Sequence, residues 1–199
     1  MNTLATAGGS AAAPFGLGNY TIKRPFLTLF GRKFHVFGPD GRQVMFVKHK
    51  ILTFKDEWNI YTDESESAAL IRVKARQAIG LNIVTDVFDA KSGEKVGAVR
   101  NKGLKSIVRD TWEVLDAADN VVGSFGEDSN ALLRRFVPIL LGHWHMEVGG
   151  TSVAKVDQVF RFFTKEFALA ITPGAKVDPR LAIGCTMLAL MRELMREAR

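Results

Sequence analysis

The C-terminal segment constrains this chain most strongly, because it predicts a helix that is apolar on every side. Asp178 can cap the free N–H groups of a first turn, and Pro179 suits the first helical position. We therefore expect a helix over residues 179–197. Thr186 carries the only polar side chain between Leu181 and Met191, and the apolar side chains point in all directions around a 3.6-residue period. Such a helix has to be enclosed by the rest of the domain.

Residues 20–171 predict the enclosing structure, because they alternate short β-rich segments with turn residues. The clearest hairpin joins residues 32–37 to residues 42–50 through Gly38-Pro39-Asp40-Gly41. Similar hairpins are expected at residues 86–100, 112–125 and 146–160, the last with residues 146–153 leading into a second strand that begins at Ala154. A short helix is expected at residues 129–136. The sequence therefore predicts a mostly β (α+β) fold: a closed antiparallel β-barrel of about 12 strands around a hydrophobic C-terminal α-helix.

The 199 residues fit one domain, residues 19–199, with its central helix at about residues 179–197. Residues 1–18 are rich in Ala, Gly, Ser and Thr and lack the pattern of a secretory signal, so we expect a disordered N-terminal tail. The longest strongly apolar run, Leu181 to Met191, is 11 residues long, whereas a membrane-spanning helix needs about 20. No transmembrane insertion is expected.

The single cysteine, Cys185, excludes a disulfide framework and is typical of a reducing, cytoplasmic location. Because it falls within the apolar helix, we expect a packed thiol rather than a nucleophile.

Motifs that carry chemistry are largely missing from the sequence. There is no nucleophile elbow, phosphate-binding loop or dinucleotide fingerprint, so no enzyme activity and no cofactor are expected. His143 and His145 share one face of a strand, but two ligands fall short of a metal site and no metal is expected. His35 and His49 are isolated, and the acidic residues between Asp56 and Glu66 are expected to face water.

The more informative pattern is cationic. Arg72, Lys74 and Arg76 alternate along one strand and should project from one side of it. More cations follow the hairpin strand that begins at Glu94: Arg100, Lys102, Lys105 and Arg109. If these strands are neighbours, their cations form a patch suited to phosphates; the alternative is an ordinary solvated outer face. Exposed stacking aromatics are not evident, so lipid headgroups are a better expected partner than nucleic acid.

Four features in this order resemble the LURP-one-related family, which belongs with the tubby C-terminal domain and the phospholipid scramblases. They are the hairpin with Phe37-Gly-Pro-Asp-Gly41, the segment at residues 54–61, the repeated Val-Phe-Asp and Val-Leu-Asp hairpins, and the closing apolar helix. The resemblance covers about residues 20–199. It implies a barrel that surrounds a hydrophobic C-terminal helix.

The resemblance also implies a ligand. Tubby-type domains bind phosphoinositides through an alternating pair of cations on one strand and an arginine that follows a Val-Gly-x-hydrophobic pattern. Lys74 and Arg76 match the pair, and Arg100 matches the arginine. The basic run is thinner here, because Gln77 and Ala78 follow Arg76. The cysteine-rich stretch and the proline-rich N-terminus of scramblases are missing.

We therefore expect a noncatalytic barrel that binds anionic phospholipid or phosphoinositide headgroups peripherally at a membrane surface. In this hypothesis Lys74, Arg76 and Arg100 contact phosphate oxygens, and Lys102 and Lys105 add longer-range attraction. The main alternative is a protein–protein interaction or structural module with no lipid ligand. A third hypothesis is a scramblase-like role in which the C-terminal helix enters the bilayer, although its apolar run is short for that.

Overall fold

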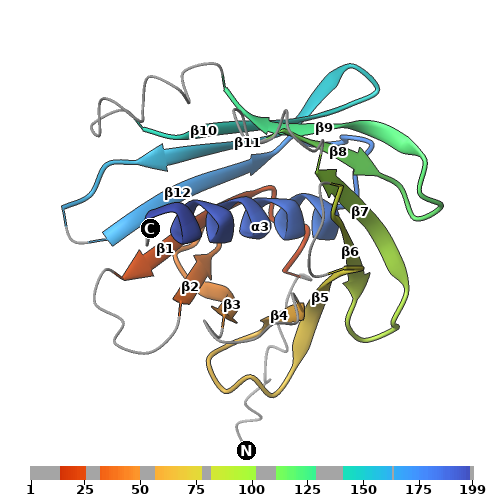
Figure 1. Ribbon diagram of the computed structural model, residues 1–199. Helices are drawn as coiled ribbons and strands as arrows, with labels where there is room; N and C mark the ends of the chain where they lie inside the picture. Colours follow the sequence, from red (N-terminus) through yellow and green to blue (C-terminus); the bar gives the residue numbers. More distant parts are fainter. Residues whose placement is uncertain are drawn as a thin grey trace, which may run out of the picture.

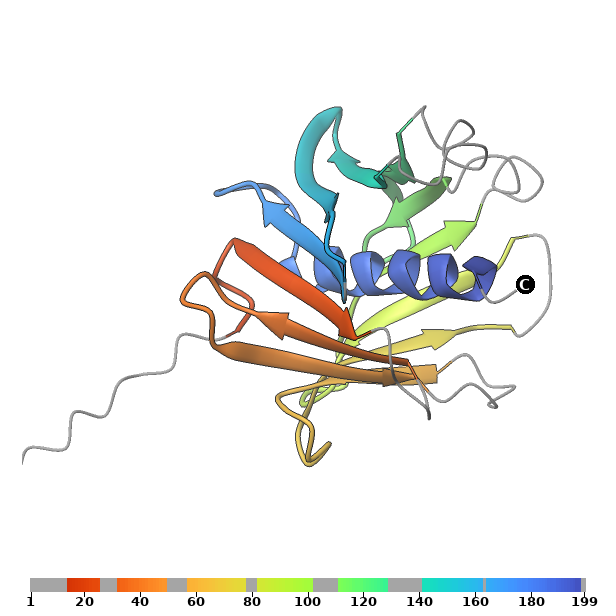
Figure 2. The same ribbon diagram turned by 90° about the vertical axis from the view of Figure 1, so that its left-hand side faces the viewer.

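The computed structural model describes residues 14–25, 32–49, 57–77, 82–101, 111–128, 141–162 and 164–197. Twelve strands in these residues form a closed barrel, and one long helix runs through its middle (Figures 1 and 2). The strands are β1 (Asn19–Pro25), β2 (Arg32–Phe37), β3 (Gln43–His49), β4 (Glu57–Tyr61), β5 (Ala69–Ala75), β6 (Val84–Asp89), β7 (Lys95–Asn101), β8 (Thr111–Leu115), β9 (Val121–Glu127), β10 (His143–Val148), β11 (Thr151–Val159) and β12 (Thr164–Ile171). The helix is α3 (Pro179–Glu197). The fold class expected from the sequence is confirmed.

Every strand pairs antiparallel with the next strand in the chain, and β1 pairs with β12 to close the barrel. All odd-numbered strands therefore end at one rim of the barrel and all even-numbered strands at the other. We call the rim where the even-numbered strands end the entry rim, because the helix begins there: its residue Arg180 contacts Asp89 at the end of β6. We call the opposite rim, where the odd-numbered strands end, the exit rim. There Arg192, near the other end of the helix, lies over the ring of Trp112 at the start of β8. The helix thus runs from the entry rim to the exit rim.

The helix is enclosed as its sequence predicts. Its apolar side chains from Leu181 to Met191 are buried except for the partly exposed Leu188. Thr186 is also buried, and its hydroxyl donates to the carbonyl of Ala182 over 2.8 Å, so its polar group is satisfied within the helix. Cys185 is buried in the core, which confirms the expected packed thiol, and this burial raises its pKa.

The helix begins where the sequence predicts. The Asp178 carboxylate accepts from the backbone N–H of Arg180 over 2.9 Å, and Pro179 occupies the first helical position. The Arg180 guanidinium then holds two carboxylates, Asp178 at 2.6 Å and Asp89 at 2.7 Å. This pair of contacts ties the start of the helix to the end of β6.

Close packing between the helix and the barrel wall depends on glycine at one position of β7. A Cβ atom on Gly97 would lie 2.8 Å from a methyl carbon of Leu181 and 2.6 Å from the carbonyl oxygen of Leu115. Neither distance is tolerable for a carbon atom, and the second obstacle is backbone. The Leu181 methyl group ends a flexible side chain and can move, so the fixed obstacle is the Leu115 carbonyl on β8. Glycine at this position therefore makes room for the neighbouring strand as well as for the first turn of the helix.

The hairpins agree with the sequence except at one turn. The fourth hairpin turns at Gly149 and Gly150, both with positive φ, so its second strand begins at Thr151 rather than at residue 154 as expected. Part of the expected tail, residues 14–18, forms a turn, and the Tyr20 hydroxyl donates to the Pro14 carbonyl over 2.8 Å. The helix expected at residues 129–136 and the first 13 residues of the chain lie outside the described residues.

No helix among the described residues is long and apolar enough to cross a bilayer.

Enclosure of the helix can be tested by comparing two leucines on it. We expect Leu190→Ala, at a fully buried position, to lower the free energy of unfolding by about 2–5 kcal/mol, because it leaves a cavity. Leu188→Ala, at a partly exposed position on the same helix, should cost clearly less. Urea unfolding monitored by tryptophan fluorescence measures both; equal losses would contradict an enclosed helix.

The tie between the helix and β6 should depend on pH. Backbone N–H donation from Ser92 and the Arg180 guanidinium lower the pKa of Asp89 from its ordinary 3.8 to about 2. The stability that this carboxylate contributes is therefore complete above pH ~4 and is lost as the pH falls towards 2. We expect the difference in unfolding free energy between the wild type and Asp89→Asn to shrink over that range. A difference that stays constant from pH 5 to 2 would argue against this role.

Candidate anion-binding face

Strand β5 carries its cations on the outside of the barrel. Ile71 and Val73 are fully buried in the core, and the residues that alternate with them, Arg72 and Lys74, face outward. Arg76 follows two residues after Lys74 and also lies on the outer surface, where it contacts the outward carboxylate of Asp86. The sequence prediction that these three cations share one side is therefore confirmed.

Arg100 joins the same outer surface from β7. Its neighbours Val84 on β6 and Glu113 on β8 lie directly opposite it in the sheet register. Strands β5 and β7 are separated by β6, so Arg100 is two strands away from Lys74 and Arg76. Lys102 and Lys105, the remaining cations of the predicted set, lie outside the described residues.

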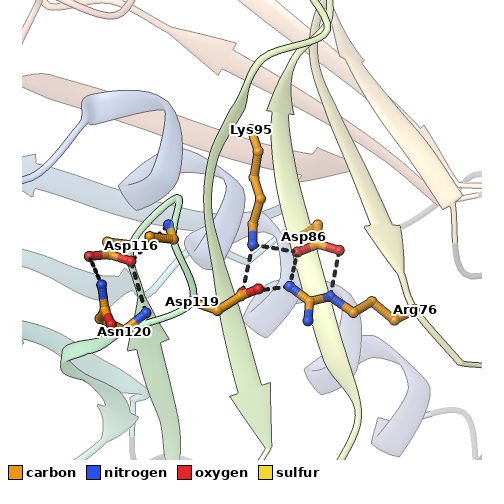
Figure 3. Close-up of polar contacts among 7 residues, drawn as sticks. Arg76, Asp86, Lys95, Asp116, Asp119 and Asn120 are labelled. Atoms are coloured by element: carbon orange, nitrogen blue, oxygen red, sulfur yellow. Dashed lines mark hydrogen bonds and ion pairs between the residues drawn. The ribbon is translucent and has the colours of Figure 1, made fainter.

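Arg76 is the centre of a network of four charges (Figure 3). Its guanidinium donates to both carboxylate oxygens of Asp86, from Nε at 2.8 Å and from Nη2 at 2.7 Å. The same Nη2 atom donates to Asp119 at 2.5 Å, and the Lys95 Nζ atom lies 2.6 Å from Asp119 and 3.4 Å from Asp86. Hydrogen bonds to Asp86 and then to Asp119 raise the pKa of the Arg76 guanidinium.

The Asp119 carboxylate contacts two cations and remains partly exposed to solvent. Hydrogen bonds from Lys95 and then from Arg76 lower its pKa, so it is ionised at neutral pH. Asp119 is 45% exposed, whereas Asp86 is 11% exposed and lies against the sheet. The two carboxylates therefore differ in how readily another anion could replace them.

Hydrogen bonds among its own residues stabilise the β8–β9 turn that carries Asp119. Asp116 accepts from the backbone N–H groups of Ala118 and Asn120, each over 2.9 Å, and from the Asn120 side chain over 3.0 Å (Figure 3). Asp119 has a φ of 68°, a left-handed conformation that Asp and Asn tolerate better than other side chains. The shape of this turn is therefore set by Asp116 and not by the contacts of Asp119.

The other two predicted cations also face carboxylates. Arg100 donates from Nε to Glu113 over 2.7 Å, across the β7–β8 ladder. Lys74 lies 3.5 Å from Glu57 on β4, and both of these side chains are largely exposed. Lys74, Arg76 and Arg100 are thus each matched by a partner of opposite charge, and a phosphate has to compete with those partners.

Arg72 behaves differently from the cations beside it. Its guanidinium lies over the ring of Phe88 on β6, 4.8 Å from the ring centre, and its Nε atom is buried without a hydrogen-bond partner. A cation stacked in this way is held by the aromatic face and its apolar contact. It adds positive charge between Lys74 and the entry rim.

Sequence reasoning missed Lys95 and Asp119, which complete the Arg76 network. Lys95 follows the turn of the β6–β7 hairpin, and the repeated hairpin pattern could have placed it near Asp86. Asp119 is 43 residues from Arg76 and no local spacing connects them. Only the order and the stagger of the strands bring the β8–β9 turn onto this face.

The two histidines predicted to share a face do so on β10, and each is bound by an aspartate. His143 Nδ1 lies 2.6 Å from Asp157 on β11, and His145 Nδ1 lies 2.6 Å from Asp128 after β9. The described part of the chain contains no group of three or more potential metal ligands. These pairs join β10 to its two neighbours.

Comparisons with known proteins give a match in structure and none in sequence. Neither a protein-family model nor a curated protein matches the chain. The X-ray structure of a protein from Arabidopsis thaliana matches 94% of this chain and 99% of that one, with a TM-score of 0.51 and 15% sequence identity. The two chains therefore share a fold over nearly their whole length. At such low identity the match shows the fold alone.

Because their carboxylate partners differ in burial, Arg76 and Lys74 should contribute different amounts to the free energy of unfolding. We expect Arg76→Ala to cost about 1–3 kcal/mol, because it leaves the largely buried Asp86 short of hydrogen bonds. Lys74→Ala breaks an exposed pair and should change the free energy of unfolding by less than about 0.5 kcal/mol. Denaturant unfolding checks both. The double variant Arg76→Ala/Asp86→Asn should recover part of the first loss, and no recovery would contradict this explanation.

Proposed function

We propose that this chain is a noncatalytic barrel of the LURP-one-related type that binds anionic phospholipid, including phosphoinositide, peripherally at the cytoplasmic surface of a membrane. The observation that best supports the proposal is that Lys74, Arg76 and Arg100 lie on one outer face of the barrel. The chain leads from the end of β7 directly to Lys102 and Lys105. The formal net charge of +6 adds long-range attraction to an anionic surface.

In this proposal a lipid phosphate takes the place of the exposed carboxylates. Asp119 and Glu57 lie at the solvent, so their cations can turn from them towards a phosphate. Asp86 stays with Arg76 and orients its guanidinium along the surface. A phosphate offers more hydrogen-bond-accepting oxygens than a carboxylate, and the phosphomonoester of a phosphoinositide headgroup also carries more negative charge; both favour the exchange.

The test is co-sedimentation with neutral and anionic vesicles, the latter with and without phosphoinositide, at low and near-physiological salt. We expect binding to the anionic vesicles and its loss in the variant Lys74→Ala/Arg76→Ala/Arg100→Ala. A matched control removes three exposed cations from the entry rim: Arg42→Ala/Lys91→Ala/Lys176→Ala. Equal losses in the two variants would show only an effect of net charge.

Because Arg76→Ala is expected to weaken the fold, Asp119→Asn supplies a second test in the opposite direction. Asparagine keeps the turn conformation and removes the competing charge, so vesicle binding should become tighter, by up to about fivefold if one exposed ion pair has to be broken. Unchanged binding in both Asp119→Asn and the triple variant would remove this face from the proposal.

A wild-type protein that binds no vesicle of any composition would favour the alternative, a protein–protein interaction or structural module. The same vesicles, with a label in one leaflet, also test the scramblase-like hypothesis by reporting transfer of lipid between leaflets.

A further inference from the structure

The turn between β11 and β12 exposes two aromatic side chains. Phe160 is 52% exposed and Phe162 is 81% exposed, and their rings meet edge to face with 5.1 Å between the centres. Among the described residues the one other large hydrophobic side chain exposed to this degree is Val121. The two phenylalanines together form a small apolar patch, and exposing its surface to water costs free energy unless another molecule covers it.

The aromatic tip, defined here as residues 160–162, is joined through a carboxylate on β12 to a second cation on β1. Arg161 lies 3.2 Å from Glu166 on β12, and Lys23 on β1 lies 4.0 Å from the same carboxylate. Glu166 is largely buried, whereas both cations are about half exposed. One shielded carboxylate is therefore shared by two exposed cations, and positive charge flanks the two rings.

The tip lies at the exit rim, because β11 ends and β12 begins there. Its turn forms the left-hand edge of the molecule in Figure 1. Strands β5 and β7 end at the same rim, and they carry Arg76 and Arg100 near or just beyond their last residues. An end-on approach of this rim to a surface therefore presents the aromatic tip together with Arg100, whereas the Arg76 guanidinium reaches back towards Asp119 in the β8–β9 turn.

We infer that the aromatic tip enters the interfacial layer of an anionic bilayer, with Phe160 and Phe162 among the acyl chain ends and Arg161 and Lys23 at the phosphates. The anionic lipid as partner rests on the proposed function; the location at the β11–β12 turn is a separate claim. Two rings on a hairpin turn are far smaller than the ~800 Å² that each partner contributes to a stable protein interface. A bilayer interface, by contrast, accepts a single protruding apolar element flanked by cations.

Insertion of the tip makes binding less sensitive to salt than cations alone would. Phosphate contacts weaken as salt screens them, whereas burial of aromatic surface does not. The wild-type protein should therefore retain vesicle binding at near-physiological salt. The variant Phe160→Ser/Phe162→Ser should lose roughly tenfold or more in vesicle affinity at that salt, and less at low salt.

The experiment measures co-sedimentation with vesicles of phosphatidylcholine and phosphatidylserine for the wild type and for Phe160→Ser/Phe162→Ser. The control is Val121→Ser, which removes an exposed apolar side chain at the entry rim. In a second measurement, Phe162→Trp reports insertion through a blue shift and through quenching by brominated lipid. The native tryptophans Trp58, Trp112 and Trp144 are buried, so they contribute little to either signal.

Loss of affinity in the serine variant but not in Val121→Ser, with quenching of the introduced tryptophan by brominated lipid, supports the inference. Wild-type affinity in the serine variant, or an unquenched introduced tryptophan on bound protein, overturns it and leaves the proposed function standing. A wild type that binds no vesicle overturns both. A shift from dimer to monomer in the serine variant, seen by sedimentation velocity, would instead assign the tip to a second copy of the chain and also overturn the inference.

Discussion

Burial of an apolar helix inside the barrel is the interaction on which the rest of this structure depends. A helix with apolar side chains in every direction cannot rest on one face of an open sheet, because its far side would stay in water. Twelve strands closed into a ring cover that helix on all sides. The inward positions of the strands are therefore committed to packing, and glycine at position 97 leaves room for both β8 and Leu181 of the helix. Chemistry that involves charged groups is consequently left to the outer wall and the two rims.

On the outer wall, the alternation of strand residues determines which charges meet. Outward positions recur every second residue, and residues directly opposite on neighbouring strands have their side chains within contact distance. Arg100 meets Glu113 in this way, and Lys74 meets Glu57. Arg76 holds two carboxylates, one shielded and one exposed, so the shielded one orients the guanidinium while the exposed one can be exchanged. A paired cation of this kind is stable without ligand and still available to a stronger anion.

Much of the fold could be predicted from local patterns, whereas the contacts of the candidate site could not. The helix bounds follow from Asp178, Pro179 and the apolar run, and the hairpins follow from their turn residues. The partnership of Arg76 with Asp119 depends on strand order and stagger across 43 residues, which no periodicity encodes. The exposure of Phe160 and Phe162 was also hidden, because they read as a continuation of an apolar strand. Strand β11 ends at Val159, and that single boundary changes them from core residues into a surface tip.

An aspartate that accepts hydrogen bonds from the backbone of its own turn recurs in four hairpins of the barrel. Four turns at the entry rim contain an aspartate whose carboxylate accepts a hydrogen bond from a backbone N–H two or three residues later in the same turn. These are Asp40, Asp63, Asp89 and Asp116. Hydrogen bonds within each turn lower the pKa of all four, so these carboxylates stay ionised well below neutral pH. Two of them also pair with cations of the same rim, Asp40 with Arg42 and Asp89 with Arg180. Each of these carboxylates therefore stabilises the turn of its own hairpin, and all four lie at the end of the barrel opposite the aromatic tip.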